Sequence, residues 1–226
     1  ANVMILCFIA FILLIWNCYQ DRLSTGRTFY AFICMGIASM EFVQALYYLP
    51  FMWVMMLFFV NSFSLRNLAA SLLGIITPYW FAAGFFLYTG NIDYIIAHFS
   101  QFVTFHPLFD YSMITIHQVV NLSFITLLAI IGTIHFLRTS YADKIRTRMI
   151  YESLIMLDIV SLLFLVLQPQ HEYELEGVMI VCTAPLIAHY ITFTKGKLPN
   201  ITFITILVTT VLLLLYNILL PPVMLL

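Results

Sequence analysis

The stretch from Ile204 to Tyr216 reads ITILVTTVLLLLY and contains no charged residue. The stretch from Ile5 to Trp16, ILCFIAFILLIW, is as apolar. Neither shows the alternation of apolar and polar residues that marks the strands of a transmembrane barrel, each about 10 residues long. Continuous apolar runs are typical of helices in a bilayer, where each backbone amide must be paired within its own segment. The two stretches therefore predict an all-α transmembrane helix bundle.

The composition of the whole chain agrees with this prediction. Of the 226 residues, 63% are hydrophobic and 8% are charged, whereas a soluble domain has about 25% charged residues. A chain of this length cannot hide so much apolar surface from water, so its predicted partner is the lipid bilayer. The net charge of −1 indicates no nucleic-acid partner. We expect one transmembrane domain, residues 1–226, that lacks natural N-terminal spans, because the chain opens without Met inside an apolar run.

Apolar segments long enough to cross a bilayer recur along the chain. We predict about eight spans, at residues 2–19, 28–43, 45–63, 67–89, 111–137, 149–167, 177–194 and 201–220. The apolar stretch 29–60 is divided into two short helices, with the bend near Pro50 and its neighbours Tyr47 and Tyr48.

Two further features modify this bundle. Pro78 lies midway along the fourth span, and because proline removes a backbone donor, the helix is predicted to kink or break there into 66–77 and 79–89. Residues 92–104 have apolar residues at helical spacing with polar residues on the other face. This pattern predicts an amphipathic helix that lies flat in the outer membrane interface.

The distribution of basic residues predicts the topology. With eight spans, all nine Lys and Arg fall on one side of the membrane. Basic loops are cytoplasmic by the positive-inside rule, so loops 20–27, 64–66, 138–148 and 195–200 are predicted to be inside. The loops near Pro50, at 90–110 and at 168–176, and both ends of the chain, are then outside.

Ionisable side chains within spans are costly and are functional candidates. Three acids qualify, namely Glu41, Glu152 and Asp158. Glu152 is spaced i, i+4 from Arg148, so an interfacial ion pair is the alternative to a functional role. Asp158 is half-way along its span. It either bonds a Ser, Thr or Tyr of a neighbouring helix or binds a proton, a cation or a polar ligand.

The fifth span carries a polar stripe of His117, Gln118, Asn121 and Ser123. His117 and Asn121 are four residues apart and share one helix face. The stripe either lines a cavity or binds a lipid headgroup, or it joins helices by hydrogen bonds. His189, in the seventh span, is either a satisfied core residue or a functional one.

The predicted outer face holds four candidate catalytic residues, Asp93, His98, His106 and Asp110. Carboxylates and histidines together can supply an acid and a base. No pair has a metal-ligand spacing, so no metal is predicted. Phosphate-binding and dinucleotide motifs are absent, so no cofactor is predicted either. The run HEYELE at 171–176 is interpreted as a solvated acidic loop, and the four cysteines as small buried hydrophobes.

Short motifs in three regions carry a resemblance. They are RLS at 22–24, GRTFYA at 26–31 and GIASM at 36–40, then SLRNLAASLLG at 64–74 and TPY at 77–79, and finally APL at 184–186 with HY at 189–190. With these motifs the chain resembles a family of polytopic inner-membrane proteins of Bacteroidota that is known as a domain of unknown function. The resemblance runs along most of the chain and implies the inner membrane of a two-membrane cell envelope. It implies no activity or catalytic residue.

A looser likeness rests on Gly36 to Ser39, which open a tight pair of spans, and on the outer interfacial helix. This arrangement is similar to that of polyprenyl-phosphate-dependent membrane glycosyltransferases. Those enzymes keep an essential acid on their first outer loop, which in this chain would precede Ala1.

Three functions are compatible with these features. The first is a non-catalytic membrane subunit with a protein partner in an envelope-assembly complex, suggested by short loops and the lack of a compact catalytic motif. The second is a glycosyltransferase-like enzyme that acts on a lipid-linked ligand at the outer face, with the fifth-span stripe as the lipid-side wall. The third is a transporter, suggested by Pro78 and Asp158.

Overall fold

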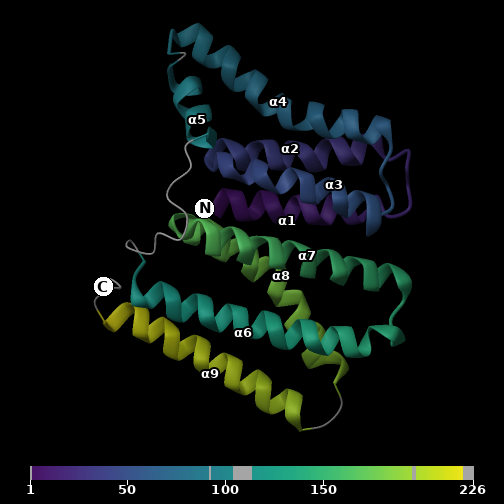
Figure 1. The fold of residues 1–226 in the computed structure, drawn as a ribbon, viewed down its shortest axis with the longest axis vertical. Helices are drawn as coiled ribbons and strands as arrows, with labels where there is room; N and C mark the ends of the chain where they lie inside the picture. Colours follow the sequence, from purple (N-terminus) through teal and green to yellow (C-terminus); the bar gives the residue numbers. More distant parts are fainter. Residues whose placement is uncertain (1, 92, 104–113, 195–196, 221–226) are drawn as a thin grey trace. The chain divides into compact units, whose positions relative to one another are not determined.

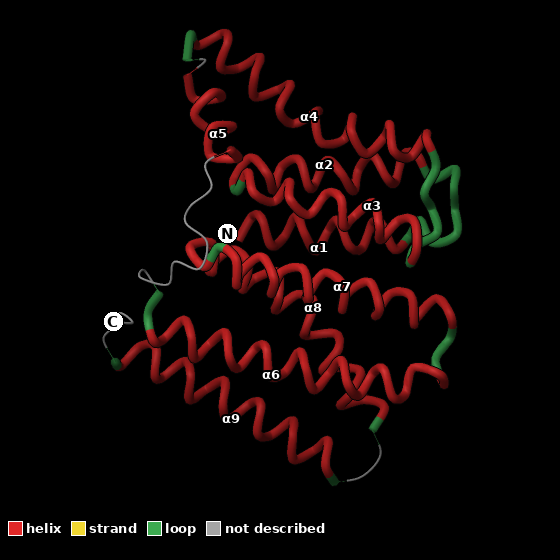
Figure 2. Tube along the Cα trace, viewed as in Figure 1, coloured by secondary structure: helices red, strands yellow, loops and turns green. Residues whose placement is uncertain are grey.

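The computed structural model describes residues 2–91, 93–103, 114–194 and 197–220. Within these ranges no strand occurs, and helices account for nearly all of the chain (Figures 1 and 2). The elements are α1 (Asn2–Trp16), α2 (Thr25–Glu41), the 3-10 helix η1 (Val43–Tyr48), α3 (Leu49–Phe58), α4 (Leu65–Thr89), α5 (Asp93–Val103), α6 (Ile116–Thr139), η2 (Ser140–Ala142), α7 (Ile145–Leu167), η3 (Pro169–His171), α8 (Glu172–Phe193) and α9 (Leu198–Leu219). The all-α prediction is confirmed for the described residues.

Five helical segments of the described chain are long and apolar enough to cross a membrane. They are Leu65–Thr89, Ile116–Ala142, Ile145–Leu167, Pro169–Phe193 and Pro199–Leu219. Large apolar side chains lie on the outside of these helices, as Trp80 does with 77% of its surface exposed. An apolar exterior is stable in lipid and not in water. The structure therefore supports a multi-pass membrane protein.

Close helix packing organises the first of two compact units, residues 1–106, in which α2 contacts both α1 and α4. A Cβ atom built on Gly36 would lie 2.7 Å from the carbonyl oxygen of Ile75, and one on Gly74 would lie 2.6 Å from that of Phe29. Only glycine allows backbones to come this close, as at small-residue contacts of membrane helices. The glycines in the motifs GIASM and SLLG thus have a packing role.

The bend between α2 and α3 lies at Phe42, not near Pro50 as predicted. Phe42 is extended, with φ −135° and ψ 96°, and directly follows the last residue of α2. Pro50 is in the first turn of α3, where a proline sacrifices no intrahelical hydrogen bond. Two helical segments do occupy the stretch 29–60, but the proline begins the second and does not bend the chain.

Pro78 does not break α4, which is one continuous helix from Leu65 to Thr89. The predicted break into half-helices 66–77 and 79–89 is therefore wrong, whereas α4 does change direction part-way along its length, which agrees with the alternative of a kink (Figure 2). Proline removes one donor from the ladder, and its ring crowds the carbonyl of the residue four positions earlier in the same helix. The ring faces α2 at Gly36, where a Cβ atom would lie 3.0 Å from Cγ of Pro78, so a small residue lets the two helices pack closely at the proline.

Within the amphipathic segment predicted at 92–104, residues 93–103 form the helix α5. None of its described side chains is buried, yet several hydrogen bonds attach it to the rest of the unit. The Tyr47 hydroxyl donates to the carbonyl of Phe102 at 2.6 Å, and His98 Nε2–H donates to the carbonyl of Ser39 at 3.0 Å. Backbone carbonyls therefore receive the bonds that position this helix.

The second unit, residues 107–226, is arranged around α8, which contacts both α6 and α7. Gly132 of α6 meets Leu186 of α8 so closely that a Cβ atom on the glycine would lie 2.9 Å from the Leu186 Cβ. α9 is attached much more loosely. Among its described side chains only Pro199 is buried.

Candidate functional site

Polar side chains hold α9 at one of its ends. His117 Nδ1 and Asn217 Oδ1 lie 3.0 Å apart, and Asn217 Nδ2 donates to Asn121 Oδ1 at 3.1 Å. Because an amide oxygen can only accept, His117 carries a proton on Nδ1. The ring of Tyr216 stacks on His117 with a centroid separation of 4.3 Å. These contacts join the end of α9 to the beginning of α6.

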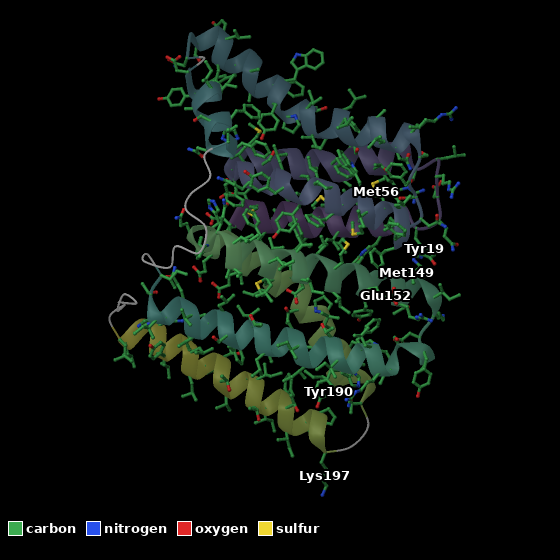
Figure 3. The ribbon with its side chains drawn as sticks, in the orientation of Figure 1. Tyr19, Met56, Met149, Glu152, Tyr190 and Lys197 are labelled. Carbon is green, nitrogen blue, oxygen red and sulfur yellow. The ribbon has the colours of Figure 1, made fainter. Side chains whose placement is uncertain are left out.

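A second polar contact holds the other end of α9. The hydroxyl oxygens of Tyr190 and Thr202 lie 3.2 Å apart (Figure 3 labels Tyr190). Tyr190 is near the end of α8, whereas Thr202 is near the beginning of α9. α9 therefore runs antiparallel to both α6 and α8, and it is fixed near its two ends.

A groove of about 660 Å³ lies between these two attachments. Its walls are Asn121, Phe124, Ile125 and Leu128 of α6, then Glu176, Ile180, Thr183, Ala184, Ile187, Ala188 and Ile191 of α8, and Phe203, Ile206, Thr210, Val211, Leu213, Leu214 and Asn217 of α9. Asn121, Glu176 and Asn217 lie at one end, which we call the amide end. Towards Ile191 and Phe203 the walls are apolar. The groove thus has one polar end and a long apolar body.

Carboxylates stand next to the amide end. Glu172 is buried and accepts a hydrogen bond from Gln118 Nε2 at 2.8 Å. Glu176 follows one helical turn later, and the two carboxyl groups are close enough to interact with each other. The interpretation of residues 171–176 as a solvated loop is therefore wrong for Glu172. α8 begins there and turns the carboxylate towards α6.

Asp158 of α7 is buried, with 6% of its surface exposed. Thr183 Oγ1 donates to its Oδ2 at 3.4 Å, and its Oδ1 has no hydrogen-bond partner among the described residues. The carboxyl group lines a separate cavity of about 180 Å³ together with Thr126 and Thr133 of α6. Because Thr183 also lines the large groove, one residue of α8 connects the two cavities.

His189 is buried in the core of the second unit. Its Nε2–H donates to Asp143 Oδ2 at 3.0 Å, which attaches the connection between α6 and α7 to α8. Aromatic rings enclose the imidazole, with Tyr151 at 4.9 Å and Phe193 at 4.7 Å between centroids. His189 Nδ1 is buried and has no hydrogen-bond partner among the described residues, so the imidazole is enclosed in the core but its hydrogen bonding is only half satisfied.

The predicted catalytic residues do not form a group in the part of the chain that the structure describes. Asp93 is exposed at the start of α5. His98 is occupied by the carbonyl of Ser39, and its Nε2 lies 3.5 Å from the Tyr79 hydroxyl, which donates to Ser39 Oγ. His106 and Asp110 lie outside the described residues. His98 therefore acts as an anchor for α5 here.

The remaining intramembrane acids have local partners. Glu41 Oε2 accepts from the backbone N–H of Met4 at 2.8 Å, which joins α2 to α1. Glu152 Oε1 lies 3.9 Å from the Arg148 guanidinium, as the i, i+4 spacing predicted (Figure 3 labels Glu152). Each of these two acids thus has a partner within its own unit or helix, and for Glu152 the partner is the predicted Arg148.

Asn217 and Thr183 were missed by sequence reasoning. Each is a hydrogen-bonding side chain within an apolar run, and this is the signal that would have found them. No group of three or more His, Cys, Asp or Glu side chains that could hold a metal ion occurs among the described residues. Comparisons with family models, curated proteins and solved structures return no match for this chain.

Proposed function

We propose that the chain is a multi-pass membrane protein that binds an amphiphile, a lipid or a lipid-linked molecule, in the groove between α6, α8 and α9. The apolar chain of the ligand lies along the body of the groove. The headgroup lies at the amide end, within reach of Asn121, Glu176 and Asn217. The observation that carries this proposal is the gathering of polar lining groups at one end of a long apolar groove.

The charges of the amide end favour a particular headgroup. The residues that line the groove include the carboxylate of Glu176 but no Lys or Arg. An exposed phosphate would face this carboxylate without a basic partner, which is unfavourable. Hydroxyl or amine groups would instead donate hydrogen bonds to the amide oxygens and to Glu176. A headgroup rich in such donors fits the site best.

The membrane topology belongs to the same proposal. Beyond the five long helices, α1, α2 and the η1–α3 pair complete eight crossings with the basic loops on the cytoplasmic side. The amide end would then face the outside of the inner membrane, the location that the family resemblance implies. Such a site would be open to lipids of the outer leaflet.

An enzyme that acts on a lipid-linked substrate is the second candidate function. It is favoured by the contact between Glu172 and Glu176 beside the amide end. Two carboxyl groups that interact closely titrate as a pair, and one can be protonated while the other is ionised, so that one can act as an acid and the other as a base. In this candidate the catalytic pair is Glu172 and Glu176, in place of the four acids and histidines predicted from the sequence.

The test of lipid binding is native extraction of the full chain, with mass spectrometry of all co-purified molecules. Ala184→Trp places a large ring in the groove wall. Ser123→Trp is the matched control, because Ser123 is exposed on α6 and bonds only its own helix at Val119. We expect a co-purified lipid in the native and Ser123→Trp proteins and its loss from Ala184→Trp.

Two results would contradict the proposal. One is equal lipid retention by both variants, each checked for an unchanged helix content. The other is a stoichiometric protein partner with no retained lipid, which would support the subunit of an envelope complex. Loss of turnover of a co-purified lipid-linked species in Glu176→Gln, with retention of the lipid, would identify the enzyme.

A further inference from the structure

Asp158 is the more deeply buried of the two acids of α7. It lies about half-way along a helix that is long and apolar enough to cross a membrane. Its side chain lines the cavity of about 180 Å³ between α6, α7 and α8. This cavity is distinct from the lipid groove and is larger than the space one water molecule needs.

The hydrogen bonding of Asp158 is incomplete. The single donor is the Thr183 hydroxyl, at the long distance of 3.4 Å from Oδ2. Oδ1 is buried and has no hydrogen-bond partner among the described residues. A carboxylate with so few donors would be strongly disfavoured away from water. Something else must therefore neutralise its charge.

No basic side chain in the described part of this unit neutralises the charge of Asp158. On α7 the nearest basic residue towards the helix start is Arg148, which is paired with Glu152 and lies ten residues, about 15 Å, from Asp158. The titratable group that interacts with Asp158 from α8 is Cys182. Thr126 and Thr133 of α6 line the cavity, and neither side chain titrates. His171 in η3 lies beyond the end of α7.

A metal cation does not fit the cavity either. A sodium, magnesium or calcium ion needs several oxygen ligands around one point. Thr126 and Thr133 are seven residues apart on one helix, a rise of about 10 Å, so they cannot both reach a single ion. The rest of the cavity wall is mainly aliphatic, with Ile130, Ile134 and Leu162. The remaining neutralising ligand is a proton.

We propose that Asp158 is a reversible proton-binding site inside the membrane. In the neutral state the proton is bonded to a carboxyl oxygen. On release that O–H bond breaks, its electron pair stays on Asp158, and the proton passes to a water molecule in the cavity, which Thr126 or Thr133 can hydrogen-bond. Thr183 connects this site to the lipid groove on the other side of α8. The site does not depend on what occupies that groove.

Infrared difference spectroscopy of the full chain in lipid nanodiscs tests the proposal. The spectrum of the Asp158→Asn protein is subtracted from that of the native protein over a pH series, so all other carboxyl groups cancel. We expect the carbonyl band of one protonated carboxylic acid at low pH, replaced reversibly by carboxylate bands as the pH rises. Glu152→Gln is the matched control and should retain this band.

Three results would overturn the proposal. They are carboxylate bands at every pH, an acid band that persists until the helices unfold, and a band that responds to sodium or potassium at constant pH, which would indicate a cation site. If Asp158→Asn fails to fold, the same subtraction with Thr183→Val replaces it. Loss of the hydroxyl donor should then shift the frequency of the acid band, and an unshifted spectrum counts against the assignment.

Discussion

Asn217 in the last turn of α9 donates a hydrogen bond of 3.1 Å to Asn121 in the second turn of α6. The same amide accepts from His117, so three polar side chains close one end of the groove between α6, α8 and α9. Within a membrane such bonds contribute about 0.6 kcal/mol on average and up to about 1.7 kcal/mol. They are therefore a modest attachment for α9.

Replacing Asn217 with Leu should loosen α9. We expect a loss of about 1 kcal/mol in the free energy of unfolding, because two hydrogen bonds are lost and His117 is left buried without its acceptor. Denaturant titration in detergent measures the change. Thr205→Val is the control, since Thr205 bonds only the Ile201 carbonyl of its own helix. Equal effects of the two substitutions would contradict the role of Asn217.

Replacing Gly74 with Ala should destabilise the first unit by about 1–3 kcal/mol, the usual effect of overpacking. The new methyl group would lie 2.6 Å from the Phe29 carbonyl oxygen, so α2 and α4 would have to separate. Gly84→Ala in the same helix has open space around the new Cβ atom. That control should be neutral or more stable by up to about 1 kcal/mol. The reverse order of the two thermal midpoints would refute this packing.

A double-mutant cycle should reveal the coupling of His189 to Asp143. Asp143→Ala leaves the buried imidazole without its acceptor, at a cost of about 1–3 kcal/mol. Once His189 is replaced with Ala, the loss of Asp143 should matter much less, because the two side chains are in contact. Tyr141→Ala, at an exposed position of the same connection, should not couple to His189. Additive effects of the Asp143 and His189 substitutions would argue against the pair.

The proposed topology predicts opposite labelling of two connections. In a variant without the four native cysteines, Tyr173→Cys should react with an impermeant maleimide added to intact cells whose outer membrane is permeabilised. Lys144→Cys should react only after the inner membrane is opened. Both positions are exposed in the structure. Labelling of both from the same side would rule out the eight-span arrangement.

Helix positions were largely predictable because most helices coincide with an apolar run of consecutive residues. The amphipathic α5 was found from its spacing, and α2 and α3 were separated although the bend was misplaced. The break predicted at Pro78 does not occur, because α4 stays continuous through the proline. The proline ring faces Gly36, more than forty residues earlier in the chain, and local sequence cannot show such a neighbour.

The candidate site was predictable only in part. His117, Gln118 and Asn121 were recognised as a stripe on one helix face because i, i+4 spacing is a local property. Their partners Asn217 and Glu172 lie about 50 to 100 residues away, and only tertiary packing brings them together. The acidic residues around Glu172 suggested a solvated loop, but the same packing buries Glu172 at the start of α8.

The sequence by itself determined that the chain is a bundle of apolar helices, because continuous apolar runs leave a backbone in lipid no other way to pair its amides. The pairing of polar residues across helices was decided by the tertiary structure. Single polar side chains in apolar runs look alike along the chain, and each can bond any neighbour. In the first unit, close contacts at Gly36 and Gly74 set α2 against α4. In the second unit, the contact of Gly132 with Leu186 sets α6 against α8 and thereby brings together the residues around the groove and around Asp158.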